Sequence, residues 1–265
     1  MVTLDQAGRS RATLLVLPPP QELTHVVEFL WLDTHPHARA MPSEWRIVPD
    51  DAPHVIYTRF TDGDHRSERH RLTVVGARRH WVDIDCRNRL LTAGARLRPG
   101  ALPALFQLPA AELTDSSVPA EWLARTDARA TLTRLEDDPP RATANRVASF
   151  ITALLGESRA PDSRARWLGA APRQNPCTIG EVATTLGIGE RALHAWAMSH
   201  LGLGLKRFLT IRRLHAAIAA RLEEDRTSTW SRIAALTGYA DQSHLVRDCR
   251  ALLGESPNQF LSRAD

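Results

Sequence analysis

Hydrophobic and polar positions alternate along the first hundred residues, which is the pattern of β-strands. Residues 26–32, 45–48, 54–60 and 71–75 have this character, and turn-forming segments such as Pro49-Asp50-Asp51 separate them. Beyond Pro99-Gly100 the apolar spacing becomes helical, over residues 102–108, 128–135 and 142–155. The pattern predicts an α+β chain whose N-terminal part is a small β-sandwich or barrel with a helical tail.

The next segment, residues 156–175, is rich in Gly, Pro, Ser and Arg and has almost no apolar periodicity. That composition is typical of a linker. A chain of 265 residues also suits two domains better than one. We therefore predict an N-terminal domain over residues 1–155, a linker over 156–175 and a C-terminal domain over 176–265.

The C-terminal segment is helical throughout and contains an internal repeat. Val182-Ala183 and Gly187 have counterparts 51 residues later in Ile233-Ala234 and Gly238. Leu201-Gly202 and Phe208 recur 52 residues later as Leu253-Gly254 and Phe260. Each copy has the pattern of a helix, a tight turn at a glycine and a second helix that ends at another glycine. This is the pattern of a helix-turn-helix motif, present twice.

The helices of the repeat have further signals at their ends. Thr178-Ile179-Gly180-Glu181 forms a capping box that predicts where the first helix begins. Residues 205–222 keep helical spacing without proline or glycine, so one continuous helix connects the two copies. It would span about 27 Å. Two recognition helices held at that distance suit successive major grooves of a duplex, which lie about 34 Å apart.

Composition narrows the class of protein. The chain is 43% hydrophobic and 24% charged, which excludes wholesale disorder and fibrous proteins. No run approaches a membrane span and the first residues do not form a signal peptide, so we expect a cytoplasmic protein without a membrane partner. The net charge is +4, and Lys206 is the single lysine. Arginine brings planar, bidentate binding of phosphates and bases, which is compatible with DNA binding.

The second copy of the repeat resembles the AraC/XylS family of transcriptional regulators. The residues that carry this resemblance are Ile233-Ala234, residues 238–247 (GYADQSHLVR), residues 254–257 (GESP) and Phe260. Ala197, Leu245, Cys249 and Leu253 depart from it, since larger or aromatic residues are common there. These smaller side chains suggest a looser pack around both recognition helices.

The N-terminal part is similar to a domain found in some members of the same family. Residues 18–20, 29–31, 47–50, 94–100 and 113–115 carry this second similarity. It implies a cupin-like fold that binds an effector or mediates dimerisation. The possible partners of such a regulator are double-stranded DNA, a small-molecule effector, a second copy of the chain and, for an activator, RNA polymerase.

The resemblance also assigns candidate DNA-reading residues. In the first motif they are Arg191, His194 and Ala195, and in the second Gln242, Ser243, His244 and Arg247. Arg247 can contact guanine and Gln242 can contact adenine, each with two hydrogen bonds, so we expect the second motif to carry at least half of the sequence specificity. Candidate phosphate contacts are Arg207, Arg212, Arg226 and Arg250. His215 lies on the apolar stripe of the connector and is expected to be a partly buried polar residue.

An effector pocket would use aromatic residues on or beside the strands, with polar groups near them. The candidates are Trp31, Trp45, His54, Tyr57, Trp81, Arg96 and Arg98, although the same aromatic residues could be ordinary core. Arg96 and Arg98 alternate in one strand and are expected on the same face. Seven of the eleven histidines precede residue 81, but no pair has convincing ligand spacing, so we predict no metal and no cofactor.

Two other classes of function remain as alternatives. A cupin-like metalloenzyme could be fused to the DNA-binding helices, or the protein could be an architectural DNA-binding protein that needs no ligand. A repair methyltransferase would need a reactive cysteine cluster, whereas Cys86, Cys177 and Cys249 are widely spaced. No GxSxG, P-loop or GxGxxG motif is present either, so we predict no enzymatic activity and no catalytic residues.

Overall fold

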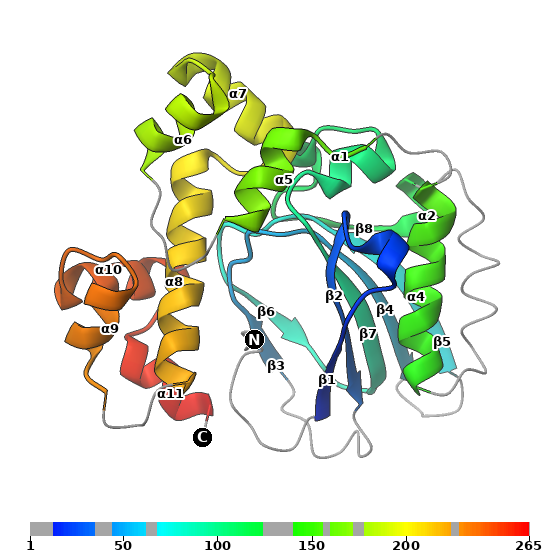
Figure 1. The fold of residues 1–265 in the computed structure, drawn as a ribbon. Helices are drawn as coiled ribbons and strands as arrows, with labels where there is room; N and C mark the ends of the chain where they lie inside the picture. Colours follow the sequence, from blue (N-terminus) through cyan, green and yellow to red (C-terminus); the bar gives the residue numbers. More distant parts are fainter. Residues whose placement is uncertain are drawn as a thin grey trace.

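The computed structural model shows a sheet-rich N-terminal part beside a helical C-terminal part (Figure 1). It describes residues 13–34, 44–61, 68–123, 140–155, 160–171, 178–223 and 228–264. The α+β organisation predicted from the sequence is confirmed. The predicted helix over residues 128–135 lies outside the described residues.

The N-terminal part is built on a six-stranded antiparallel sheet with strand order β1-β2-β7-β4-β5-β8. The strands are β1 (Thr13–Leu17), β2 (Val27–Thr34), β4 (His54–Thr61), β5 (Glu68–Val75), β7 (Arg89–Leu97) and β8 (Ser117–Pro119). A second, two-stranded sheet pairs β3 (Glu44–Ile47) with β6 (Val82–Asp85). Each segment with alternating residues lies wholly or largely within one of these strands.

One face of the large sheet packs against helix α4 (Pro140–Leu155), which crosses it in Figure 1. Side chains alternate between the two faces of a strand, so this face takes Leu30 and Leu32 of β2 and Val55 and Tyr57 of β4. They pack with the apolar stripe of α4, which consists of Val147, Phe150, Ile151 and Leu154. Trp31 and His54 therefore lie on the opposite face.

Short helices and turns connect the strands at the edges of the sheet. They are η1 (Gln21–Leu23), α1 (Ala101–Phe106), η3 (Ala110–Leu113) and α2 (Ala120–Leu123). Both α1 and η3 contact the C-terminal helices. This edge of the N-terminal part is therefore joined to the helical part.

The C-terminal part contains the two predicted helix-turn-helix motifs. The first consists of α6 (Ile179–Leu186) and α7 (Glu190–Leu201), the second of α9 (Trp230–Leu236) and α10 (Gln242–Leu253). Helix α8 (Leu205–Glu223) connects them, and α11 (Pro257–Ala264) follows the second motif. The capping box at Thr178 is present, and the turn glycines have the left-handed conformation, with φ of 61° at Gly187 and 74° at Gly238.

The segment interpreted as a linker contains a helix, α5 (Ser163–Ala170). Asp162 caps its first turn by accepting hydrogen bonds from two backbone amides. Ala165 and Leu168 are buried in the same apolar cluster as the helix-turn-helix helices, together with Val48 and Ala77 of the N-terminal part. Part of the expected linker is therefore core, and the two parts of the chain share that core.

Helix α8 is the longest of the described helices, and its burial agrees with the apolar stripe read from the sequence. His215 is 7% exposed, and its Nε2 lies 2.9 Å from the carbonyl oxygen of Pro49.

Among the described helices, none combines the length and the apolar character needed to cross a membrane.

Candidate nucleic-acid interface

The second helix of motif 2 presents three of its predicted reading residues to solvent. Asp241 begins α10 by accepting a hydrogen bond from the backbone amide of His244. Gln242, Ser243 and Arg247 are exposed on this helix. Its opposite side, with Leu245 and Cys249, is completely buried. Capping and amphipathicity thus fix which side of α10 can meet a partner.

His244 is only partly available on the same helix. Its ring packs edge-on against Tyr239, with the centroids 5.1 Å apart, and its Nε2 lies 3.8 Å from a carboxylate oxygen of Asp248. The ring is therefore supported by its own motif. We keep His244 as a candidate reading residue whose orientation Tyr239 fixes.

The first motif has a less polar surface at the matching positions. Arg191, His194 and Ala195 are exposed on α7, whereas Leu193, Trp196 and Ala197 are buried beneath them. Trp196 reaches α5, where its indole N–H donates to Asp162 over 3.3 Å. Of these three predicted residues, Arg191 and His194 can form hydrogen bonds to bases.

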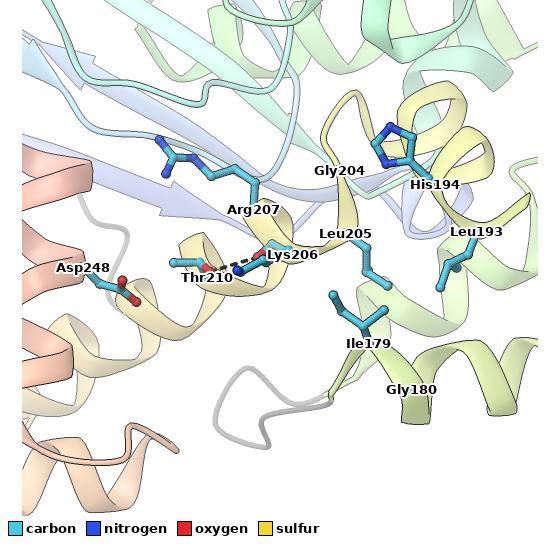
Figure 2. A pocket seen from close by; sticks show the side chains of 10 residues that line it. All are labelled: Ile179, Gly180, Leu193, His194, Gly204, Leu205, Lys206, Arg207, Thr210 and Asp248. Carbon is cyan, nitrogen blue, oxygen red and sulfur yellow. Dashed lines mark hydrogen bonds between the residues drawn. The ribbon is translucent and has the colours of Figure 1, made fainter. Parts of the chain in front are cut away.

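A groove lies between the two motifs on the side of α8 (Figure 2). Its volume is about 730 Å3, and α7 contributes His194, α8 contributes Lys206 and Thr210, and α10 contributes Asp248. Lys206 is exposed, and its backbone carbonyl accepts a hydrogen bond from the Thr210 hydroxyl. The sequence prediction omitted Lys206, although the single lysine of the chain was a signal that could have identified it.

The structure describes three of the four candidate phosphate contacts, and their environments differ. Arg250 is exposed and stays a prediction, and Arg226 lies outside the described residues. Arg207 is half-buried and donates to the carbonyl oxygen of Arg79 in the N-terminal part, so part of its hydrogen-bonding capacity is already used. Burial lowers the pKa of Arg207.

Arg212 was wrongly included among these contacts. It is only 6% exposed, and its guanidinium donates to the carbonyl oxygens of Leu168 and Ala171 at the end of α5. These carbonyls at a helix C-terminus lack partners within the helix, and a buried cation suits them well. Arg212 therefore braces α5 against α8 and does not face a ligand.

The six candidate effector residues whose side chains the structure describes do not all lie together. Trp31 and His54 are neighbours, with ring centroids 6.5 Å apart, and Gly94 leaves room for the indole, since a Cβ there would lie 2.6 Å from it. Tyr57 points to the α4 face, where its hydroxyl lies 2.5 Å from Nδ1 of His70. The side chain of Trp45 lies outside the described residues.

Of the other three effector candidates, Arg96 lies beside His54, its partner in the strand register, and both contact Asp50, whereas Trp81 and Arg98 lie elsewhere. Trp81 is 39% exposed and contacts the end of α10. Arg98 follows the end of β7, and its guanidinium donates to the carbonyl oxygen of Thr24. Arg96 is 3% exposed and pairs with three carboxylates. The expectation that Arg96 and Arg98 act together on one face is not met, because the strand ends at Leu97 between them.

Arg96 is the centre of a buried ion-pair network. Its guanidinium contacts Glu28, lies 2.6 Å from Asp50 and lies 2.7 Å from Asp51. Burial by itself would raise the pKa of Asp50, but Arg96 and His54 outweigh it and hold that pKa well below its usual range. Burial would lower the pKa of Arg96, yet its three carboxylates raise it.

The network also reaches the connector helix. Carboxylate oxygens of Asp50 and Asp51 and a ring nitrogen of His215 lie within 4.8 Å of one another, a spacing that a metal ion would allow. The guanidinium of Arg96 already supplies positive charge to both aspartates. Asp50, Asp51 and His215 therefore belong to the ion-pair network around Arg96.

Comparison with known proteins supports the assignment of both parts. Residues 182–263 match the family model of a helix-turn-helix domain, and residues 15–119 match a domain of unknown function, DUF6597. A search of curated proteins finds no match to this sequence. Each match covers one of the two parts already separated by secondary structure.

Solved structures of ToxT from Vibrio cholerae are similar to the chain over most of its length. One, of the apo protein, has 10% identity and a TM-score of 0.45 and covers 85% of this chain and 99% of its own. Another, described as bound to an unsaturated fatty acid, has 7% identity and a TM-score of 0.41, with coverages of 82% and 93%.

The duplicated motif, its exposed helices and the family match define the class of this protein. The chain carries an AraC-type helix-turn-helix domain at its C-terminus and is a DNA-binding transcription regulator. Its N-terminal part is a DUF6597 domain built on a β-sheet.

Proposed function

We propose that the protein binds a bipartite DNA site, with α7 and α10 each entering one of two successive major grooves. The observation that carries this proposal is the pair of exposed helix faces joined by one continuous helix. Helix α8 has 19 residues and therefore spans about 28 Å. That length is comparable to the spacing of successive major grooves, about 34 Å.

We propose that the DNA backbone runs along the groove between the two motifs. Lys206 and Thr210 line it midway between His194 and Asp248, so a phosphate strand that leaves one major groove would pass over them. An ammonium group is a strong phosphate contact without base preference. We therefore add Lys206 to Arg250 as a phosphate contact that positions the duplex.

We infer a regulatory role for the N-terminal domain, with a small molecule as its ligand. The support is the face opposite α4, where Trp31 and His54 are only half-buried and Gly94 makes room for the indole. A dimer through the apolar stripe of α4 is not part of this proposal, because Val147, Phe150, Ile151 and Leu154 are at most 3% exposed.

Selection of binding sites from a random duplex library tests the DNA proposal. The full-length chain should recover two half-sites one helical turn apart, with an affinity that falls steeply as salt is raised. Lys206→Ala should lower affinity for all sequences alike and reduce the salt dependence, while Arg166→Ala, which removes an exposed arginine of α5, should change neither. Recovery of a single short half-site would contradict two-groove reading.

A thermal-shift screen of metabolites against the full-length chain tests the regulatory role. A ligand that stabilises the wild type should lose its effect in Trp31→Ala and keep it in Trp122→Ala, since Trp122 is 73% exposed and lies elsewhere. A ligand whose effect survives Trp31→Ala would place the binding site on another surface.

A further inference from the structure

The glycines that end the two recognition helices occupy equivalent positions of the internal repeat. Gly202 follows α7 and Gly254 follows α10, and both have the left-handed conformation, with φ of 74° and 79°. Such a glycine is a common way to end a helix, and nothing in that role requires contact with another domain. Here, however, both glycines are in contact with the N-terminal domain.

The first contact joins the end of α7 to the segment around η3. A Cβ at Gly202 would lie 3.0 Å from the carbonyl oxygen of Ala110 and from the hydroxyl of Thr114. The Thr114 hydroxyl donates a hydrogen bond to the carbonyl oxygen of Gly202. The N-terminal domain thus provides a donor at the helix end, where backbone carbonyls lack partners within the helix.

The second contact joins the end of α10 to the two-stranded sheet. A Cβ at Gly254 would lie 2.9 Å from Nε1 of Trp81. The Arg46 guanidinium lies 3.9 Å from the centroid of the Trp81 ring and forms a bidentate pair with Asp83. The indole is therefore held in place by a side chain that the paired strands β3 and β6 themselves fix.

Helix α8 is also held between these two contacts. His215 meets the carbonyl oxygen of Pro49, and the Arg207 guanidinium donates to the carbonyl oxygen of Arg79 over 2.5 Å. The N-terminal domain thus touches the end of each recognition helix and the connector between them. Because Arg191, Gln242 and Arg247 are exposed while these contacts exist, the N-terminal domain does not cover the reading faces.

We propose that the N-terminal domain is a two-point clamp that fixes the relative orientation of the two recognition helices and thereby selects the spacing of the two DNA half-sites. The first point is Thr114 on Gly202, and the second is Trp81 on Gly254. This proposal rests on the bipartite DNA binding proposed above. In this proposal Gly202 and Gly254 each have two roles: they end a recognition helix, and they leave room for contact with the N-terminal domain.

Three glycine substitutions test the clamp with a matched control. Gly202→Ala and Gly254→Ala insert a methyl group into the two contacts, whereas Gly187→Ala inserts one at a left-handed glycine with nothing within 4 Å. All three variants have the same unfavourable backbone conformation. Only the first two press on the N-terminal domain.

The readout is the affinity of the full-length variants for duplexes in which the half-site spacing changes by one base pair. One base pair rotates a half-site by about 34° to 36° around the duplex. We expect the wild type and Gly187→Ala to prefer one spacing by at least about 10-fold, and the two clamp variants to retain no more than about a 3-fold preference, with unchanged affinity for a single half-site. A full spacing preference in both clamp variants would overturn the proposal.

A second set of variants tests the clamp from the side of the N-terminal domain and without DNA. Thr114→Val should accelerate amide hydrogen exchange at the end of α7, and Trp81→Ala at the end of α10, each without changing the other helix. Trp122→Ala is the control. Unchanged exchange in both variants would refute the clamp whether or not the wild type binds DNA. If exchange accelerates in both variants but the wild type binds no bipartite site, the proposed function and the selection of spacing fail, whereas the contact of the N-terminal domain with both helix ends stands.

Discussion

The two helix-turn-helix motifs are copies of one unit, but they have different neighbours. The second helix of motif 1 packs against α1 and η3 of the N-terminal domain, while motif 2 touches that domain mainly at Gly254. Each motif is also braced by a neighbouring helix. The Trp196 indole donates to Asp162 ahead of α5, and the Trp230 indole donates to Asn258 of α11 over 2.6 Å.

This difference shows that repetition in sequence does not imply equivalence in the folded chain. The brace of motif 2 follows it in sequence, so the motif and its brace fold as one continuous segment. The brace of motif 1 comes from the segment between the domains, and Leu168 there shares a core with Val48 of the N-terminal part. Motif 1 is therefore the copy whose stability depends on its surroundings.

Removing α5 should produce the largest difference in stability between the two motifs. In a fragment of residues 176–265, motif 1 loses the burial of Leu168 and Arg212 loses two carbonyl acceptors. We expect a loss of about 5 kcal/mol relative to a fragment of residues 160–265. Denaturant unfolding gives this difference, and amide exchange should show α7 unprotected while α10 stays protected. Equal protection of both helices in the shorter fragment would contradict the comparison.

A substitution of Arg96 should lower the stability of both motifs to the same extent, because the ion-pair network reaches the connector helix that they share. Arg96→Met leaves three carboxylates without their cation, which should cost about 3 to 5 kcal/mol at pH 7. Arg46→Met, which removes a partly exposed pair with Asp83, should cost at most about 1 kcal/mol.

The same variant has a defined pH dependence. In the wild type the depressed pKa of Asp50 gives stability that is present above the usual pKa of an aspartate and is lost as the pH falls through the folded value. Without Arg96, burial should raise the pKa of Asp50. Asp50 of the variant should therefore take up a proton at a higher pH than in the wild type, which removes the unpaired buried charge. Urea unfolding should show that the loss in free energy of unfolding relative to the wild type becomes smaller as the pH is lowered from 7 to 5. A loss that does not change with pH would argue against carboxylate burial as the cause.

The reading faces should divide sequence specificity unequally. Arg247→Ala should relax base preference at one or two positions by about 1 to 3 kcal/mol, because a bidentate contact to guanine is lost. Arg191→Ala should have the smaller effect on specificity. Site selection with both variants measures this, with Arg166→Ala as the control. If Arg191→Ala alone abolished the selected motif, motif 1 would be the principal reader.

The smallest expected effect concerns the core positions that match across the repeat. Ala197 of motif 1 corresponds to Cys249 of motif 2, and both are fully buried. Burial raises the pKa of the Cys249 thiol to about 12. In a chain with Cys86 and Cys177 replaced by serine, Cys249 should not react with a disulfide reagent at pH 8 until the protein unfolds. Cys249→Ala should cost about 1 kcal/mol, and a larger loss would show that motif 2 packs its core more tightly.

Local patterns predicted most of the fold. Strands β2, β4 and β5, the helices of the repeat and the connector follow from alternation, helical spacing and the capping box at Thr178. Helix α5 was missed because it has only two buried apolar side chains, Ala165 and Leu168, in a short segment that also contains Ser, Arg and Gly. Asp162, which caps it, was the available signal.

The errors in the candidate site arise from contacts between distant residues. Arg212 lies on the same stripe of α8 as Phe208, Ile211 and His215, so helical spacing could have shown its burial. No local pattern could show that Arg96 meets Asp50 and Asp51, or that Trp81 meets Gly254. These pairs depend on how the sheet and the helices are arranged, which periodicity does not specify.

The unbroken helix α8 has a consequence for how such a chain can change over generations. A single inserted residue would turn everything beyond it by about 100° and move it by 1.5 Å, so motif 2 would no longer face the same side as motif 1. A point substitution on the helix surface has no comparable effect. The exposed positions of residues 205–223 can therefore vary in chemistry, but the number of residues cannot, and new binding-site preferences are expected to arise on α7 and α10.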